Sequence, residues 1–295
     1  MNSDTHIIII GGGLAGLTSA IHLAKHQIPV MLIEKEVYPK HKVCGEYISN
    51  EVLPYLQFLG IRIDDLNPIK ISELNISTAK GKMIKSKLPL GGFGISRYTL
   101  DHYLWNLAKN IGVQMITDCV LDINHLDSVF RVRTVNHGVL TGKYAIGAYG
   151  KRSSLDKNLN RDFSHKKSPW LAVKGHYKGE FDSKTVALHN FEGGYCGLSL
   201  VENNNINACY LVNYKSFKRY KNIRHFEEQI LYKNPHLKSF FENSELVFKN
   251  PITISQINFD KKKPVENHIF MTGDAAGLIH PLCGNGMAMA IHNGK

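Results

Sequence analysis

The stretch that decides the fold is Ile7-Ile8-Ile9-Ile10-Gly11-Gly12-Gly13-Leu14-Ala15-Gly16, near the start of this 295-residue chain. Four β-branched residues without polar alternation predict a strand that is buried on both faces. The residues after it fit the pattern G-x-G-x-x-G, and apolar residues then recur at helical spacing as far as Ala24. The run from Pro29 to Glu34 returns as a second strand. The sequence therefore predicts a βαβ unit that opens an α/β fold.

The three glycines of the pattern have different expected duties. Gly11 permits the tight turn, Gly13 lets the backbone approach a pyrophosphate, and Gly16 allows the helix to pack closely on the sheet. The first helical residues, Leu14 and Ala15, offer free N–H groups and a partial positive charge to phosphate. The alternative is a glycine-rich turn that serves packing alone.

Glu34 ends the second strand, about 20 residues beyond the last glycine of the pattern. A carboxylate at this place accepts hydrogen bonds from a ribose hydroxyl, which favours FAD or NAD over NADP. Lys35 follows it and is a further candidate contact to the cofactor.

A second set of glycines stands at the far end of the chain. The apolar run from His268 to Met271 predicts a short strand, and Gly273-Asp274 follows it. A helical run then opens at Gly284-Asn285-Gly286-Met287. Helix N–H groups at such a glycine turn can face a carbonyl or a delocalised anion.

In this order and spacing, the motifs resemble the FAD-dependent oxidoreductases of the geranylgeranyl reductase and para-hydroxybenzoate hydroxylase type. The matching segments are spread over the whole chain and comprise Gly11 to Gly16 with Glu34, Tyr38 to Glu46, Ser96-Arg97 with Asp101 and Leu104, Ile146 to Ser153, and Gly273 to Gly286. The resemblance implies a flavoprotein that holds FAD and receives electrons from NAD(P)H or another donor.

The resemblance also implies an α/β (α+β) fold, in which a Rossmann-like FAD-binding domain carries an inserted antiparallel β-sheet substrate domain. We expect residues 1–70, 98–155 and 264–295 to form the FAD-binding domain, and residues 71–97 and 156–263 to form the β-sheet domain. Short β-like runs between Trp170 and Val212 fit this sheet, and Phe226 to Phe241 predicts a helix on its flank. Relatives usually continue after the last glycine turn, so we expect a C-terminal helical region to be missing.

The same resemblance implies where the cofactor is held. Asp274, beside Gly273, would bind the ribityl chain, and Arg97 would lie on the FAD phosphates or their ribityl side. Val120, at the end of a strand from Val113, would contact adenine through its backbone, and Lys42 would reach phosphate or solvent.

Other residues are expected around the flavin ring. Its pyrimidine edge would face the helix N–H groups of Gly284, Gly286 and Met287. The remaining cofactor contacts are Cys44, Gly45, Gly150 and Pro281. No catalytic residue and no metal ligand is assigned, and a free cysteine such as Cys44 is more often a small buried hydrophobe.

The chain departs from the family at three motifs. Tyr149-Gly150 stands where many members have Asp-Gly, so direct reduction by NADPH is not carried over. Tyr195-Cys196-Gly197-Leu198-Ser199 stands where the reductases have Tyr-x-Trp-x-Phe-Pro, so isoprenoid specificity is not carried over. With two tryptophans in all, Trp105 and Trp170, the chain cannot contain the Trp-x-Trp-x-Ile-Pro motif of flavin-dependent halogenases.

The charge of the chain points to an anionic partner. Its 36 Lys and Arg against 25 Asp and Glu give a formal net charge of +11, which favours a phosphate-bearing cofactor, an acidic membrane surface or nucleic acid. The densest basic stretch, Lys215 to Arg224, is best explained as a solvated face, because lysine is common on protein surfaces. We predict a small-molecule substrate rather than nucleic acid, with peripheral membrane contact as the weaker alternative and the oligomeric state unknown.

The composition, 43% hydrophobic and 21% charged, is that of a globular protein and excludes a disordered or collagenous chain. Five scattered cysteines without a C-x-x-C pair predict a reduced, cytoplasmic protein. No signal peptide precedes the first strand, and no apolar stretch approaches the about 18 residues of a membrane span.

We therefore predict an FAD-dependent oxidoreductase, either a reductase or a monooxygenase, that acts on a hydrophobic organic molecule such as a polyketide, a quinone or an isoprenoid-like compound. Two alternatives stay open. The positive charge suggests a flavoprotein that modifies nucleic acid, and the short C-terminal end suggests a truncated, non-catalytic FAD-binding module.

Overall fold

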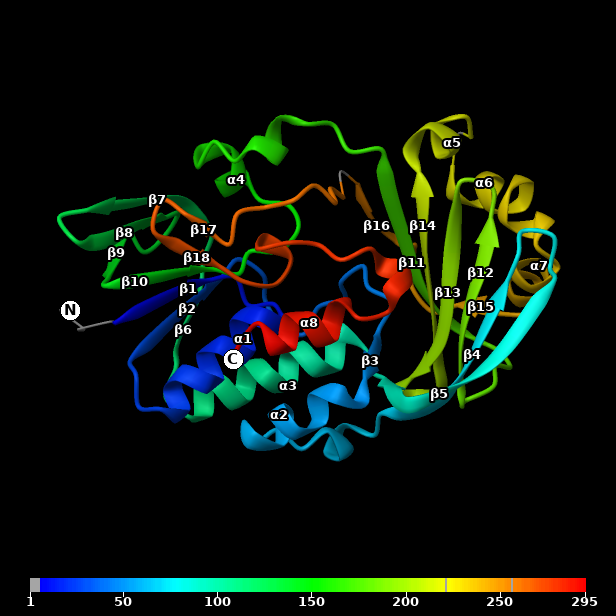
Figure 1. The fold of residues 1–295 in the computed structure, drawn as a ribbon, viewed down its shortest axis with the longest axis horizontal. Helices are drawn as coiled ribbons and strands as arrows, with labels where there is room; N and C mark the ends of the chain where they lie inside the picture. The colour runs from blue at the N-terminus through cyan, green and yellow to red at the C-terminus, as the bar shows by residue number, and fades with distance from the viewer. Residues whose placement is uncertain (1–5, 221, 256) are drawn as a thin grey trace.

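The computed structural model describes residues 6–220, 222–255 and 257–295. Their strands form three sheets, and Figure 1 shows the two larger ones at opposite ends of the molecule. The first sheet has six described strands in the order β17 (Val265–Glu266), β18 (Ile269–Met271), β10 (Tyr144–Gly147), β1 (Ile7–Ile10), β2 (Val30–Glu34) and β6 (Gln114–Thr117). The predicted α/β (α+β) fold is confirmed.

β1 lies near the middle of this sheet and is covered on both faces, as predicted. Ile9 packs toward one face together with the helices α1 (Leu14–Lys25), α3 (Arg97–Asn110) and α8 (Gly286–His292). Ile8 and Ile10 pack toward the other face, against the small sheet of β7 (Val120–Leu126), β8 (Val129–Thr134) and β9 (Val139–Gly142). Alternate side chains of one apolar run therefore serve two cores.

The second sheet is the predicted inserted sheet. Its described strands follow the order β15 (Glu245–Leu246), β11 (Trp170–Lys178), β14 (Asn205–Asn213), β13 (Gly194–Val201), β12 (Thr185–Phe191), β4 (Ile69–Ser77), β5 (Met83–Gly94) and β3 (Tyr47–Ser49), with β16 (Ile252–Ser255) also beside β11. Most neighbours are antiparallel, but β12 pairs with β4 in parallel. The sheet is therefore mixed, and its parallel pair is the place where the β4–β5 hairpin, from a distant part of the chain, joins it.

The remaining helices are short. They are α2 (Leu53–Phe58), α4 (Ser154–Asn158), α5 (Tyr214–Lys218), α6 (Ile223–Gln229) and α7 (Pro235–Glu242). The last three lie along one face of the second sheet (Figure 1). In the part of the chain that the structure describes, no helix has the length and apolar character needed to cross a membrane.

The range from Phe226 to Phe241 is largely helical, as predicted, but the chain divides it into separate helices. Asn234 ends the first part and caps α7, accepting the His236 N–H at 3.0 Å. Its amide donates to Ser77 Oγ at 2.8 Å in the second sheet. Pro235 then takes the first helical position, where its missing N–H is not needed.

The strand predicted from Val113 to Val120 is also shorter than expected. β6 ends at Thr117, and Asp118 accepts hydrogen bonds from the N–H groups of Cys119, Asn136 and His137. This turn sends the chain into the small sheet, so Val120 begins β7 instead of ending β6.

Glu227 is a carboxylate buried behind the second sheet, where the Tyr210 hydroxyl donates to it at 3.1 Å. Burial raises the pKa of Glu227 to about 7. The folded protein therefore keeps a proton that the unfolded chain releases near the usual pKa of 4.5. The contribution of Glu227 to the free energy of unfolding is therefore complete below pH 4.5 and is lost as the pH rises toward 7.

We expect the free energy of unfolding to fall by roughly 2 to 3 kcal/mol between pH 5 and pH 8 through this group alone. Glu227→Gln removes the titration, so the variant should gain stability over the wild type by that amount as the pH rises. Urea unfolding of both proteins at the two pH values measures the difference. An equal pH dependence in both proteins would contradict the assignment.

Candidate cofactor and substrate site

The turn between β1 and α1 is closed by glycines that have no room for a side chain. Gly11 has a φ of +109°, and a Cβ there would lie 2.4 Å from Ala148 O. A Cβ on Gly16 would lie 1.9 Å from Gly11 O, so α1 packs on the turn only because this residue is glycine. The expected duties of both residues as turn and packing glycines are consistent with these distances.

Gly13 differs from the other two because the space above it is open. Within 4 Å, a Cβ on Gly13 would meet only Arg97 Nη2, at 3.8 Å. Gly13 is the N-cap of α1, and no side chain caps this end of the helix. The first N–H groups of α1 therefore face the open space above Gly13. These groups include those of Leu14 and Ala15. A side chain at residue 13 would fill this space, which suits a phosphate.

Glu34 fixes the same turn from the neighbouring strand. Its Oε2 accepts the Gly12 N–H at 2.6 Å, and its Oε1 accepts the Glu36 N–H at 3.0 Å. The carboxylate is buried and lines the cavity described below. Each oxygen keeps a lone pair for a ribose hydroxyl, so the position fits the predicted role.

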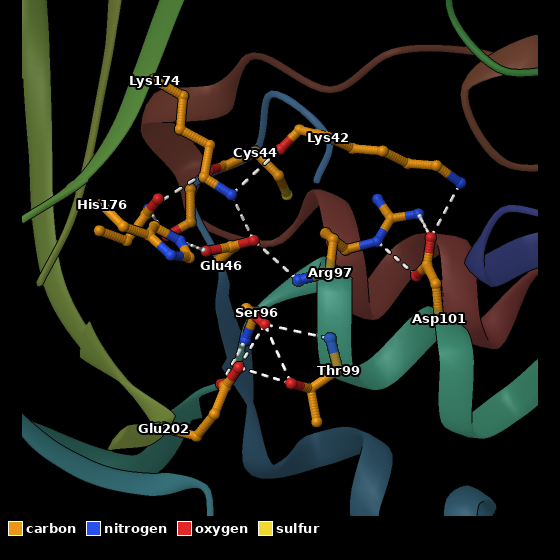
Figure 2. A network of polar contacts seen from close by, with 12 residues as sticks. Lys42, Cys44, Glu46, Ser96, Arg97, Thr99, Asp101, Lys174, His176 and Glu202 are labelled. Atoms are coloured by element: carbon orange, nitrogen blue, oxygen red, sulfur yellow. Dashed lines mark hydrogen bonds and ion pairs between the residues drawn. The ribbon is translucent and has the colours of Figure 1, made fainter. Parts of the chain in front are cut away.

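Arg97 is held in place by a buried carboxylate. Its Nε and Nη2 donate to Asp101 at 2.6 and 2.8 Å, and Lys42 Nζ donates to the same carboxylate at 2.8 Å (Figure 2). Burial alone would raise the pKa of Asp101, but Arg97 and Lys42 lower it below its ordinary value. The guanidinium therefore stays fixed and charged beside Gly13, where it can neutralise a phosphate.

The glycine turn at the far end of the chain meets the first one directly. A Cβ on Gly273, which has a φ of +58°, would lie 2.8 Å from the Cβ of Ala15 in α1. Asp274 lines the same cavity as Gly11 and Gly13, and Lys151 Nζ lies 3.8 Å from its Oδ2. The two ends of the chain thus form one site, as a single extended dinucleotide requires.

A network of buried charges holds the segment that contains Cys44 and Gly45. Glu46 accepts the Arg97 N–H and His176 Nε2, each at 2.7 Å, and also pairs with Lys174 Nζ (Figure 2). Burial opposes the charge of Glu46, but Lys174 and His176 lower the pKa of Glu46 below its ordinary value. None of the three side chains is more than 3% exposed.

The second sheet also holds the backbone carbonyls of this segment. Lys174 Nζ donates to Lys42 O at 3.1 Å. The Asn207 amide donates to Cys44 O at 3.2 Å and to Gly45 O at 2.8 Å. β11 and β14 therefore fix the segment of Cys44 and Gly45, which forms one wall of the cavity.

These elements enclose a cavity of about 910 Å³, a volume at the upper end of the range for ligand pockets. Its lining includes most of the predicted cofactor contacts, namely Gly11, Gly13, Leu14, Ala15, Glu34, Lys35, Lys42, Cys44, Gly45, Arg97, Gly150, Gly273, Asp274, Pro281, Gly284, Gly286 and Met287. Gly16 lies behind the turn as a packing residue. Val120 is buried in the core between the first sheet and the small sheet, so the structure does not bring it to the cavity.

Lys174, His176 and Asn207 were not predicted as site residues. The first two could have been found from the sequence, because they lie two residues apart in a strand that begins with apolar residues, and side chains at this spacing share one face of the sheet. Their partner Glu46 lies in the matching segment from Tyr38 to Glu46, but no role was predicted for it. No local pattern marks Asn207, whose contacts span more than a hundred residues of sequence.

Two curated proteins similar to this chain are named for quinones. Menaquinone reductase from Mycobacterium tuberculosis is 25% identical over 183 residues, which are 60% of this chain and 45% of the relative. A probable electron transfer flavoprotein-quinone oxidoreductase from Escherichia coli is 28% identical over 161 residues, covering 52% of this chain and 38% of the relative. The chain spans less than half the length of these curated relatives.

The fold matches solved flavoenzymes over the full chain. The crystal structure of CmlS, a flavin-dependent halogenase, superposes with a TM-score of 0.85 at 20% identity and covers 100% of this chain and 57% of that chain. At this identity the match shows the fold alone. The model of the family described as "FAD binding domain" matches residues 4–294. Because that match extends from the first glycine turn to the last, and both turns line one cavity, the chain belongs to the FAD-binding domain family and its cofactor is FAD.

Proposed function

We propose that this chain is the FAD-binding part of an oxidoreductase that reduces an apolar, quinone-type small molecule. The observation that carries the proposal is that the cavity has two differently lined parts. One part is lined by the glycine turns, Glu34 and Arg97, and another by apolar residues of the second sheet and its flanks, among them Ala172, Leu188, Leu211, Ile254 and Leu278.

The residues of this chain position and shield the reactants. The N-terminus of α1 and Arg97 would hold the pyrophosphate, Glu34 the adenosine ribose, and Asp274 the ribityl chain. Bound FAD would supply two-electron chemistry between a donor and an acceptor. The segment of Cys44 and Gly45, fixed by the second sheet, would close the cavity beside the flavin and exclude water.

The apolar lining supports a substrate that water dissolves poorly, and two similar proteins are named for quinones. Reduction of a quinone to a hydroquinone takes two electrons and two protons. NADH or NADPH supplies a hydride, and the solvent supplies the second proton. Halogenation receives no comparable support, since the chain lacks the tryptophan motif of halogenases.

The identity of the electron donor, NADH or NADPH, is also part of the proposal. Tyr149 stands where many family members have an aspartate, and its hydroxyl lies 3.3 Å from Arg161 Nη1. Direct reduction by NADH or NADPH therefore needs its own measurement. Peripheral contact with an acidic membrane and a cytoplasmic location also stay predictions.

An anaerobic absorbance experiment tests this function. The FAD-loaded protein is mixed with NADH or NADPH, and menadione, a naphthoquinone, is then added in known amounts. We expect the visible flavin absorbance to bleach with the donor, or with dithionite if neither nucleotide reacts, and to return after one menadione per FAD. Failure of menadione to restore the absorbance would contradict the quinone assignment.

The same protein in air separates the alternatives. Oxygen uptake coupled to a hydroxylated product would replace the reductase by a monooxygenase. A protein whose flavin no donor or acceptor turns over would favour a non-catalytic binding module. RNA binding that survives raised salt and is lost on changing Lys218 and Arg219 would favour a nucleic-acid function.

A further inference from the structure

β13 crosses the cavity with a row of alternating residues that face it. Tyr195, Gly197 and Ser199 all line the cavity, as does Cys209, which is paired with Gly197 on β14. In a strand, residues two apart share one face of the sheet. This face is opposite to the one that packs against α5, α6 and α7.

Gly197 leaves the middle of this row without a side chain. A Cβ there would meet Leu188 Cδ2 at 3.6 Å and Cys209 O at 3.7 Å, which are ordinary contact distances. The backbone of Gly197 is not in the left-handed region, so nothing in its conformation demands glycine. The glycine instead leaves this part of the cavity wall without a side chain.

Ser199, next along the row, carries an unsatisfied polar atom. Its side chain is 1% exposed, and among the described residues its Oγ has no hydrogen-bond partner. Asn207 is paired with Ser199 across the strands, and its Oδ1 also lacks a partner there. Buried polar groups nearly always have partners, so the unsatisfied Oγ of Ser199, a residue that lines the cavity, points to a ligand.

We propose that Gly197 and Ser199 form the substrate subsite, in which a flat ring lies on Gly197 and a ring oxygen bonds to Ser199. The inference rests on the proposed function and names the part of the substrate that is recognised. A carbonyl oxygen would accept from Ser199 Oγ–H. After reduction, the hydroxyl at the same place could donate to Ser199 Oγ, so both forms of a quinone find a partner.

The subsite predicts opposite effects on ligand binding and on folding. Ser199→Ala should weaken menadione binding about fivefold, the effect of one hydrogen bond. The temperature of thermal unfolding should stay constant or rise, because the variant removes a buried hydroxyl that has no partner in the empty protein. A structural role for Ser199 would lower that temperature.

Gly197 is tested by a series of increasing side-chain size. Gly197→Ala should bind menadione nearly as well as the wild type, whereas Gly197→Leu should bind on the order of a hundredfold more weakly because its side chain occupies the space of the ring. FAD content should remain unchanged in both variants, since no cofactor contact is assigned to this residue.

The experiment titrates oxidised, FAD-loaded protein with menadione and follows the change in flavin absorbance, which needs no turnover. Ser164→Ala is the matched control, because Ser164 Oγ also lacks a partner but does not line the cavity. This control should bind menadione like the wild type. Equal binding by wild type, Ser199→Ala and Gly197→Leu would overturn the subsite and leave the proposed function intact. A wild-type protein that does not bind menadione would overturn both.

Discussion

Gly13→Asp should give a folded protein that no longer takes up FAD. Gly13 has extended backbone angles at the N-cap of α1, a place where aspartate is a preferred residue. Its carboxylate would occupy the open space beside Arg97 and repel the pyrophosphate. Two like charges about 4 Å apart at an effective dielectric of about 20 repel by about 4 kcal/mol, or roughly a thousandfold in affinity.

Fluorescence titration of the apoprotein with FAD measures this loss, and urea unfolding of the apoprotein checks the fold. We expect the free energy of unfolding to stay within a few tenths of a kcal/mol of the wild type. Ala79→Asp, in the exposed turn of the β4–β5 hairpin, adds the same charge away from the cavity and should bind FAD normally. Tight FAD binding by Gly13→Asp would place the pyrophosphate elsewhere.

Lys174→Met should destabilise the protein by about 3 kcal/mol. Lys174 and Glu46 are fully buried, and removing one member of a buried ion pair leaves an uncompensated charge. The expected loss lies at the lower end of the known range because Glu46 keeps its hydrogen bonds from His176 Nε2 and the Arg97 N–H. Cys44 and Gly45 should also lose their fixed position, so FAD affinity should fall with stability.

The double variant Lys174→Met/Glu46→Gln separates charge from packing. It contains no buried charge at these two positions, so we expect it to recover most of the lost stability. Lys178→Met changes an exposed lysine of the same strand and should leave the free energy of unfolding nearly unchanged. Urea unfolding of the four proteins gives the comparison. A double variant less stable than Lys174→Met would show that the network acts through packing.

The sequence was sufficient to predict those parts of the fold that local geometry determines. The Ile7–Ile10 run, the glycine turn and α1 follow from neighbouring residues, because the apolar run, the left-handed φ of Gly11 and the close approach of Gly16 to Gly11 O are local features. The start of α3 at Arg97 is also fixed locally, because Ser96 caps the helix by accepting the Thr99 N–H at 3.1 Å.

Features that depend on distant contacts were not predictable. Asn234 breaks the predicted helix because its amide reaches Ser77, Thr78 and Asn190 in the second sheet. Val120 leaves the first sheet because Asp118 collects three backbone N–H groups. In both cases the decisive hydrogen bonds join residues from separate segments, which no local pattern reveals.

The same limit applies to the site. The contacts of the glycine turns could be expected from motifs, since each turn carries its own conformational requirement. The pairing of Glu46 with Lys174 and His176 joins residues that are 128 and 130 positions apart in the chain. A buried lysine is understood only when its partner is known.

The most direct test of the account compares FAD with its halves. Apoprotein is titrated with FAD, FMN and AMP, and the stoichiometry and dissociation constant of each are measured. If the glycine turns at both ends of the chain hold one extended molecule, one FAD binds per chain at least a hundredfold more tightly than either fragment, and both fragments compete with it. FMN binding as tight as FAD, or no FAD uptake, would contradict a shared site.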